Sequence, residues 1–352
     1  MDSAGRMHDR ALIPEIPLLE FERFDAGEAQ RHTFLADLRT AARDVGFFYL
    51  SGHGVDPRLS EDLIHTARRF FALPEADKLA IEMVNSAHFR GYTRIAGELT
   101  RGRPDWREQI DIGAERRVLE RSVGAPAWTR LQGPNQWPAG LPELRPLVLR
   151  WQDAVRQVLE RLLRAFALAL GQTADVFEPL HRDEPHLMVK LIRYPGREAG
   201  QDAQGVGPHK DSELLSLLLQ DHQPGLEVET AQGWIRVAPR SGTLVVNIGE
   251  ALELASDGYL RATLHRVASP PAGQERLSVA FFLGPRLDAR VPQLNLPPEL
   301  AAQARGPECD PNNPLFHDVG LNYLKGRLRS HPDVARRHYA DILEPAAPSP
   351  RL

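Results

Sequence analysis

Residues 207–212 read GPHKDS, and they place a histidine and an aspartate two positions apart, directly after Gly-Pro. In an extended segment residues i and i+2 point to the same side, so His209 and Asp211 would present an imidazole and a carboxylate toward one point. Lys210 lies between them and is expected to point away, as a solvated or supporting residue. A His-x-Asp pair occurs often by chance, so the motif predicts half of a metal site and needs a third ligand.

His265 is the candidate third ligand: it lies in residues 263–267, TLHRV, before another strand, and two strands of one barrel can converge there. Two histidines and one carboxylate on one side of a metal form the facial triad of non-haem Fe(II) oxygenases, which leaves coordination positions open for catalysis. The same donors also serve zinc, so a zinc hydrolase is an alternative, and a metal-free binding module is another. His209, Asp211 and His265 are therefore the predicted metal-binding and catalytic residues.

Short apolar segments dominate the chain from residue 187 onward, and each is bounded by Gly, Pro, Asp or Gln. They cover residues 187–194, 216–220, 225–230, 243–249 and 276–283. Short strands broken by turns at this spacing are typical of a sandwich or barrel such as a jelly roll. The second half therefore predicts a β core.

Helical periodicity dominates the first half of the chain instead. Apolar residues recur at helical spacing over residues 32–43, 59–71 and 147–170, and one buried strand is expected at 46–50. A short helical C-terminus is expected around residues 332–343. The predicted fold class is mainly β with flanking helices, in which a helical N-terminal region supports a jelly-roll core.

The segment RLSVAFF at residues 276–282 suggests a second functional feature beside the metal ligands. Strand alternation places four of its side chains on one inward face, namely Arg276, Ser278, Ala280 and Phe282. A buried arginine needs a partner, and its planar fork suits a carboxylate, to which the serine hydroxyl would add a hydrogen bond. The alternative is an internal salt bridge to an acidic residue of the chain.

Composition and charge limit the classes of partner. The 352 residues are 42% hydrophobic and carry 43 basic and 47 acidic side chains, a net charge of −4 without a block of like charge. We therefore expect a small-molecule substrate rather than nucleic acid or a membrane. The first twenty residues lack the apolar region of a signal peptide, and Cys309 is the only cysteine, so we expect a cytoplasmic protein without an internal disulfide, with Cys309 as a loop thiol. The oligomeric state is not predicted.

With these residues in this order, the chain resembles the Fe(II)- and 2-oxoglutarate-dependent dioxygenase superfamily, and specifically its isopenicillin N synthase-like branch. Further matching segments are IP at 16–17, GFFY at 46–49, HGV at 53–55, ARRFFALP at 67–74, FRGY at 89–92 and RYP at 193–195. The resemblance implies a double-stranded β-helix, which is a distorted jelly roll, over residues 181–290. It also implies an N-terminal helix and strand region over 1–180 and a helical C-terminal extension over 291–352.

The resemblance also implies a set of cofactors. Fe(II) would be chelated by 2-oxoglutarate through its 1-carboxylate and keto oxygen, and O2 would take the last open position. Arg276 and Ser278 would hold the distal carboxylate of 2-oxoglutarate, with help from Tyr194. The products would be succinate, CO2 and an oxidised substrate, with hydroxylation as the expected outcome and desaturation or cyclisation as open alternatives.

Two departures from the family pattern affect these expectations. Many plant members have an asparagine two residues before the tyrosine, where this chain has Ile192. Isopenicillin N synthase itself keeps the Arg-x-Ser pair but uses it for its peptide substrate and needs no 2-oxoglutarate. A four-electron oxidase that works without 2-oxoglutarate is therefore an alternative function.

Three further residues are candidates for contact with a small, anionic substrate. Arg90 aligns with a position that contacts a substrate carboxylate in the synthase, and Lys190 shares a strand face with Tyr194. Phe282 would form an apolar wall. The alternatives are a solvated loop position for Arg90 and an ordinary ion pair for Lys190.

Overall fold

The computed structural model describes residues 15–119, 124–202, 204–308, 310–311 and 313–343. Its centre is an eight-stranded sheet, antiparallel apart from one edge pair. The strands follow the order β1 (Leu18–Glu20), β2 (Phe47–Ser51), β12 (Leu244–Ile248), β9 (Leu215–Gln220), β14 (Glu275–Gly284), β7 (His186–Pro195), β6 (Glu108–Gly113) and β3 (Gly91–Thr93).

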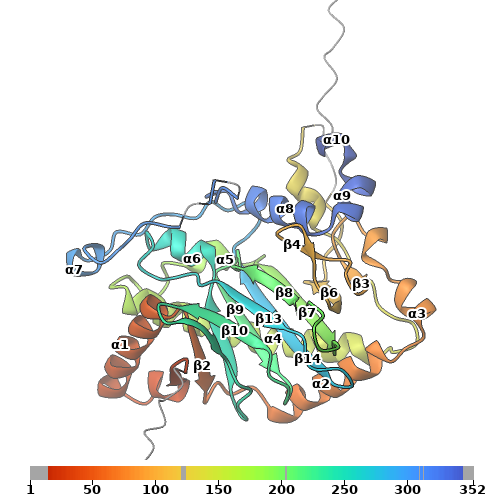
Figure 1. Cartoon of the computed structure of the whole chain (residues 1–352). Coiled ribbons are helices and arrows are strands. Elements are labelled where there is room, and N and C mark those ends of the chain that lie inside the picture. The colour runs from red at the N-terminus through yellow and green to blue at the C-terminus, as the bar shows by residue number, and fades with distance from the viewer. Residues whose placement is uncertain (1–14, 120–123, 203, 309, 312, 344–352) are drawn as a thin grey trace, which may run out of the picture.

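A smaller sheet of four strands packs against the inner face of the large one (Figure 1). Its order is β11 (Gly233–Arg236), β10 (Leu226–Thr230), β13 (His265–Ala268) and β8 (Gln204–His209). A hairpin of β4 (Leu99–Thr100) and β5 (Arg103–Pro104) lies beside β8. Two sheets that enclose one apolar layer form the predicted mainly β core of the jelly-roll type.

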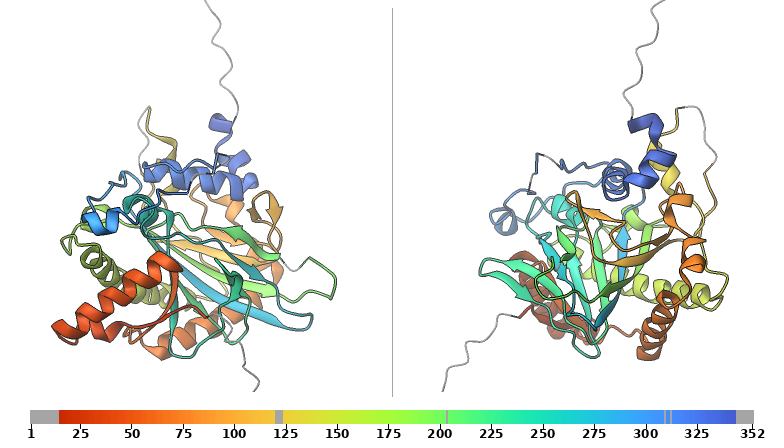
Figure 2. Two further views of the ribbon diagram at one scale, coloured as in Figure 1. Left: turned by 60° about the vertical axis from the view of Figure 1, so that its left-hand side comes forward. Right: turned by 45° about the vertical axis from the view of Figure 1, so that its right-hand side comes forward.

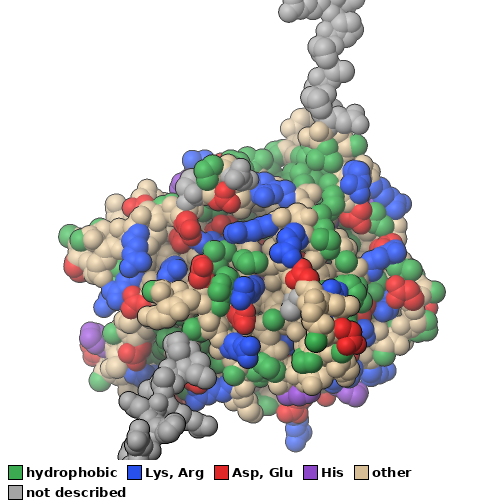
Figure 3. All heavy atoms as spheres, in the orientation of Figure 1, with side chains coloured by type: hydrophobic (Ala, Val, Ile, Leu, Met, Phe, Trp, Pro, Cys, Tyr) green, Lys and Arg blue, Asp and Glu red, His purple; other side chains and the backbone are tan. Residues whose placement is uncertain are grey.

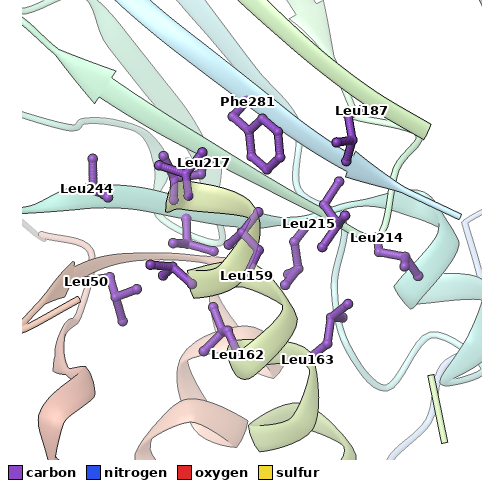
Figure 4. Close-up of a cluster of buried hydrophobic side chains, with 14 of the residues drawn as sticks. Leu50, Leu159, Leu162, Leu163, Leu187, Leu214, Leu215, Leu217, Leu244 and Phe281 are labelled. Carbon is purple, nitrogen blue, oxygen red and sulfur yellow. The ribbon is translucent and has the colours of Figure 1, made fainter. Parts of the chain in front are cut away.

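Three long helices cover the outer face of the large sheet. They are α1 (Glu28–Asp44), α2 (Pro57–Phe71) and α4 (Leu144–Ala169), and they confirm the helices predicted from periodicity. Helix α4 buries Trp151 and Leu159 on the stripe that faces the sheet, and Trp151 meets the ring of Phe281 at 6.4 Å. Figure 4 shows leucines of α4, β2, β9 and β12 in one cluster with Phe281.

The remaining helices are short and lie mainly at the ends of the core. They are α3 (Glu75–Leu79), α5 (Glu178–His181), α6 (Glu250–Ala255), α7 (Pro298–Ala301), α8 (Val319–Ser330), α9 (Pro332–His338) and α10 (Ala340–Leu343), with 3-10 turns at Phe21–Phe24, Met83–Asn85 and Ala127–Leu131. Helices α8 to α10 sit at the end of the molecule opposite α1 and α2 (Figures 1 and 2). This cap begins at Val319, earlier than the predicted residue 332.

All five strands predicted in the second half form, and β14 shows the predicted alternation. Leu277, Val279 and Phe281 face the helices, whereas Ala280 joins the apolar layer between the sheets. The first half contributes more strand than its periodicity predicts, because β1, β3 and β6 join β2 in the large sheet. Cys309 lies outside the described residues.

No helix in the described part of the chain combines the length and the apolar character needed to cross a membrane. On the face drawn in Figure 3, basic and acidic side chains are interspersed.

Candidate metal centre

Two neighbouring strands of the small sheet bring the predicted metal ligands together. His209 ends β8 and His265 begins β13, and the two residues are direct partners in the antiparallel register. The Nε2 atoms of both imidazoles lie 3.6 Å from Oδ1 of Asp211. One ligand atom from each of the three residues falls within 4.8 Å of the others, so the three side chains converge on one point.

Backbone carbonyls fix the orientation of both imidazoles. Nδ1 of His209 lies 2.9 Å from the Gly207 carbonyl oxygen, and Nδ1 of His265 lies 3.0 Å from that of Thr263. A carbonyl oxygen only accepts, so each Nδ1 carries the hydrogen and each Nε2 keeps a lone pair for a metal. Burial, followed by the neighbouring charge of His265, lowers the pKa of His209 to about 3, which keeps this imidazole neutral.

The carboxylate of Asp211 is held from its other side. Asn247 on β12 donates from Nδ2 to Oδ2 of Asp211 at 2.9 Å, which leaves Oδ1 directed at the histidines. Burial alone would raise the pKa of Asp211, but the nearby imidazoles and the hydrogen bond from Asn247 lower it overall. Two imidazoles and one carboxylate are the donor set that suits Fe(II) with open positions, so the residues fit this metal.

Arg276 lies deeper between the sheets and is fully buried. Its Nη1 donates to Oγ of Ser278 at 3.2 Å and its Nη2 to Oε1 of Gln220 at 2.9 Å, while its guanidinium lies 5.0 Å from the ring centre of Tyr194. Nε of Arg276 has no partner, and burial lowers the pKa of the group. No carboxylate of the described chain lies within 4.0 Å of it, so the salt-bridge alternative is wrong and the fork fits the carboxylate of a ligand.

The position of Ile192 agrees with its apolar character. Ile192 pairs with Ser278 in the register of β7 and β14 and packs in the apolar layer between the sheets. The chain therefore offers an apolar side chain where many plant members would place an amide.

Lys190 is part of a network of buried charges. Its Nζ lies 3.1 Å from Glu98 and 3.4 Å from Asp111. These contacts are the ordinary ion pair given above as the alternative for Lys190. Arg107 also contacts Glu98 at 2.7 Å, and Arg327 of α8 contacts Asp111 at 2.9 Å. Sequence reasoning missed these four partners, because local patterns do not show which distant charges pair.

Arg90 is not a solvated loop residue, so that alternative is wrong. Its side chain is 3% exposed, and its guanidinium donates to the carbonyl oxygens of His88 at 2.8 Å and Leu131 at 3.5 Å. Its Nε has no partner, and burial lowers its pKa. Phe282 is partly buried between the apolar layer and the residues under α8.

Two further charged residues flank the metal ligands. Lys210 points away from the ligands, as expected, and its Nζ lies 3.2 Å from Glu253 and 2.7 Å from Glu308. Glu213 is buried, and its burial, followed by the charge of Asp211, raises its pKa to about 7. Sequence reasoning did not single out Glu213.

Comparisons with known proteins agree with this geometry. Residues 16–140 match the family model described as non-haem dioxygenase in morphine synthesis N-terminal, and residues 185–285 match that of the 2OG-Fe(II) oxygenase superfamily. The chain is 36% identical to the 2-oxoglutarate-dependent dioxygenase frbJ of Dothideomycetidae sp., with 93% of each chain covered. It is also 36% identical to a homoarginine-6-hydroxylase of Arabidopsis thaliana, with 77% of this chain and 82% of the relative covered.

A solved structure shares the fold. A Neurospora crassa protein crystallised in complex with alpha-KG and thymine superimposes with a TM-score of 0.71 at 23% identity, over 92% of this chain and 97% of that one. The names of the relatives support a 2-oxoglutarate-dependent activity and not the four-electron oxidase or zinc hydrolase alternatives. The triad, the two family matches and these relatives together place the chain in the 2OG-Fe(II) oxygenase superfamily, as a dioxygenase that uses Fe(II), 2-oxoglutarate and O2.

Proposed function

We propose that this enzyme hydroxylates a C–H bond of a small, amino-acid-like substrate that carries a carboxylate. His209, Asp211 and His265 hold one Fe(II), and Arg276 with Ser278 and Tyr194 binds the distal carboxylate of 2-oxoglutarate. When bound, these groups couple the oxidation of the substrate by O2 to the conversion of 2-oxoglutarate into succinate and CO2.

The roles of the protein residues follow from their contacts. The carbonyl oxygens of Gly207 and Thr263 fix the tautomers of the histidines, which direct both Nε2 lone pairs to one point. The apolar layer around Arg276 excludes water from the carboxylate site, which strengthens a charge-assisted hydrogen bond there.

A single observation carries the substrate class: Arg90 is a buried guanidinium that has no carboxylate within 4.0 Å among the described residues. A buried cation is stabilised by an anion, so Arg90 is the candidate receptor for a substrate carboxylate. Lys190 is already engaged by Glu98 and Asp111, so we assign it, with Phe282, to the walls of the space that the substrate occupies beside the metal ligands. The homoarginine-6-hydroxylases among the relatives act on an amino acid, in line with this class.

An end-point assay tests the proposal. Purified enzyme with Fe(II) and 2-oxoglutarate is incubated with a panel of free amino acids that includes L-homoarginine, and succinate and product mass are measured. We expect substrate-dependent succinate and a product that has gained one oxygen atom. Succinate formation that no panel member stimulates would contradict the proposed substrate class, and product formed without 2-oxoglutarate would support the four-electron oxidase.

We also propose the domain organisation and the location of the protein. Residues 1–180 form the N-terminal dioxygenase region, 181–290 the catalytic core and 291–352 a helical extension, a division supported by the ranges of the two family matches. An isopenicillin N synthase-like assignment rests on the segments shared with that branch. The single cysteine supports a cytoplasmic location, which fractionation of the native host would test.

A further inference from the structure

Strand β8 loses its regular pairing with β13 immediately before the metal ligand His209. Along β8 the paired residues Val206 and His209 are three positions apart, whereas their partners on β13 are two positions apart. This count defines a β-bulge, and Gly207 and Pro208 occupy it. A bulge interrupts the ladder, and a proline has no amide hydrogen to donate to it. The backbone that carries His209 therefore needs support from outside the small sheet.

Asp105 supplies this support from the N-terminal half of the chain. It lies between β5 and β6, 102 residues before Gly207, and it is fully buried. Its Oδ1 accepts hydrogen bonds from the Gly207 amide and from Nε2 of Gln204, each at 3.2 Å. Its Oδ2 accepts from the Thr100 hydroxyl at 2.7 Å and from Nη2 of Arg107 at 3.3 Å. One carboxylate thus joins the hairpin of β4 and β5 to the bulge in β8.

The backbone of Asp105 is held as closely as its side chain. Its amide donates to the carbonyl oxygen of Glu98 at 3.0 Å, and its own carbonyl oxygen accepts from the amides of Ala96 at 3.1 Å and Arg107 at 2.9 Å. Arg107 balances the charge of Asp105 and is itself held by Glu98 at 2.7 Å. Because these groups are all paired, the carboxylate of Asp105 is a fixed anchor for the amide that it contacts.

Gly207 is the conformationally free position that this anchor restrains. A Cβ on Gly207 would lie 3.0 Å from Cγ2 of Thr100 and 3.1 Å from Nε2 of Gln204, so the close approach of the hairpin favours glycine. Glycine has no side chain that would limit its backbone dihedral angles. Pro208 limits them from one side, because a proline disfavours the helical region for the residue before it. The hydrogen bond to Asp105 limits them from the other side.

The carbonyl group of Gly207 in turn orients the imidazole of His209. Its oxygen lies 2.9 Å from Nδ1 of His209, and Nε2 of the same ring lies 3.6 Å from Oδ1 of Asp211. A rotation of the Gly207 backbone would move this oxygen and disturb the contact that fixes the tautomer and the direction of the ring. Two consecutive hydrogen bonds therefore connect Asp105 to a metal ligand.

We propose that Asp105 is a positioning residue of the metal centre. Its carboxylate anchors the amide of Gly207, and the carbonyl group of Gly207 then holds His209 in the orientation that binds Fe(II). Asp105 acts through Gly207, whereas Asn247 holds the ligand Asp211 directly. This inference rests on the proposed function, because it concerns the same metal site.

The iron affinity of matched variants tests the inference. Fe(II) dissociation constants are measured by anaerobic equilibrium titration. Asp105→Ala should bind Fe(II) about tenfold more weakly than wild type, because a metal ligand loses its support. Asp105→Asn keeps an oxygen that can accept from the Gly207 amide, so its affinity should stay within about threefold of wild type. Glu108→Ala removes a buried carboxylate of the same segment that pairs with Lys78 and Arg193 instead, and it should bind Fe(II) like wild type.

Proton NMR of the metal-free enzyme reports on His209 without iron. A hydrogen-bonded Nδ1 proton exchanges slowly with water and gives a downfield signal, which is identified by its absence from His209→Ala. We expect this signal in wild type, Asp105→Asn and Glu108→Ala, and its loss or broadening in Asp105→Ala. Asp105→Leu, which is similar in shape and has no acceptor, takes the place of Asp105→Ala if that variant does not fold.

Four outcomes would overturn the inference. They are an unchanged iron affinity in Asp105→Ala, an unchanged His209 signal in that variant, an equal loss of affinity in Glu108→Ala, and an equal loss in Asp105→Asn, which would assign the effect to charge. Each of them leaves the metal site standing as long as wild type binds Fe(II). Failure of wild type to bind Fe(II) would instead contradict the proposed metal site, and the NMR comparison would still decide whether Asp105 orients His209.

Discussion

Arg276 and Lys190 show how the surroundings of a single cation decide its role. Both are buried on the inner face of the large sheet, but Lys190 has two carboxylates within 3.4 Å, whereas Arg276 bonds to the neutral side chains of Ser278 and Gln220 and has no carboxylate within 4.0 Å among the described residues. The charge of Lys190 is balanced within the protein, and we propose that the carboxylate of a ligand balances that of Arg276.

A substitution at Arg276 tests this difference. Arg276→Lys keeps the charge but loses the fork, so the Michaelis constant for 2-oxoglutarate should rise about tenfold or more, with Fe(II) binding retained. Arg286→Lys, an exposed exchange beside Asp288, is the control and should leave the constant unchanged. An unchanged constant in Arg276→Lys would mean that this guanidinium does not bind the cosubstrate.

Asn247 is the residue that sequence reasoning could not assign to the metal site. Its hydrogen bond orients Asp211 from a strand that is distant in sequence, and residues that support metal ligands typically contribute about 10- to 100-fold to metal affinity. Asn247→Ala should therefore weaken Fe(II) binding by a factor in this range, as measured by equilibrium titration. Asn85→Ala, far from the site on the surface, should bind Fe(II) like wild type. Equal affinity in the two variants would exclude an orienting role.

At the scale of elements, the sequence predicted the helices and strands whose buried face is apolar and regular. Helix α4 and strand β14 belong to this group, and the inward direction of Arg276 followed from simple alternation. Strand β6 escaped prediction because Glu108 and Asp111 make its segment polar. In the core, Glu108 is balanced by Lys78 and Arg193, and Asp111 by Lys190 and Arg327. Such partners come from distant parts of the chain, so local periodicity cannot reveal them.

Helix α4 should contribute strongly to stability through one aromatic side chain. Trp151 is fully buried between the helices and the sheet, so Trp151→Ala should lower the free energy of unfolding by about 3–5 kcal/mol. Leu168→Ala changes a residue of the same helix that is 36% exposed, and we expect a loss of about 1 kcal/mol or less. Urea denaturation of both variants gives the comparison. Similar losses would show that the stripe facing the sheet is not the main stabilising face.

At the scale of the whole molecule, the cap formed by α8 to α10 covers one end of the core, and Arg327 of α8 reaches the buried Asp111. His331, between these helices, is 1% exposed, and burial, followed by the charge of Arg327, lowers its pKa to about 3. Glu98 and Asp111 act in the opposite direction but do not compensate. Protonation of this imidazole therefore opposes the folded state.

The depressed pKa of His331 predicts how stability depends on pH. The unfolded chain binds the proton near pH 6.5 and the folded chain only near 3, so this contribution is complete above pH 6.5 and is lost as the pH falls. The loss should reach about 2 kcal/mol at pH 5. Denaturation of metal-free wild type and His331→Asn at pH 7.5 and 5 isolates the contribution of His331. The other titrating groups cancel when the pH-dependent change in the free energy of unfolding is compared between the two proteins. An equal decrease in both proteins would refute the assignment.

The most direct measurement of the central claim, one Fe(II) held by His209, Asp211 and His265 and chelated by 2-oxoglutarate, is an anaerobic absorption titration. Metal-free enzyme receives Fe(II) and then 2-oxoglutarate, with His265→Ala as the matched variant. We predict a weak metal-to-ligand charge-transfer band in the visible range for wild type, saturating at one equivalent of iron, and no band for His265→Ala. A band of equal intensity in His265→Ala, or none in wild type that has bound iron, would contradict the account.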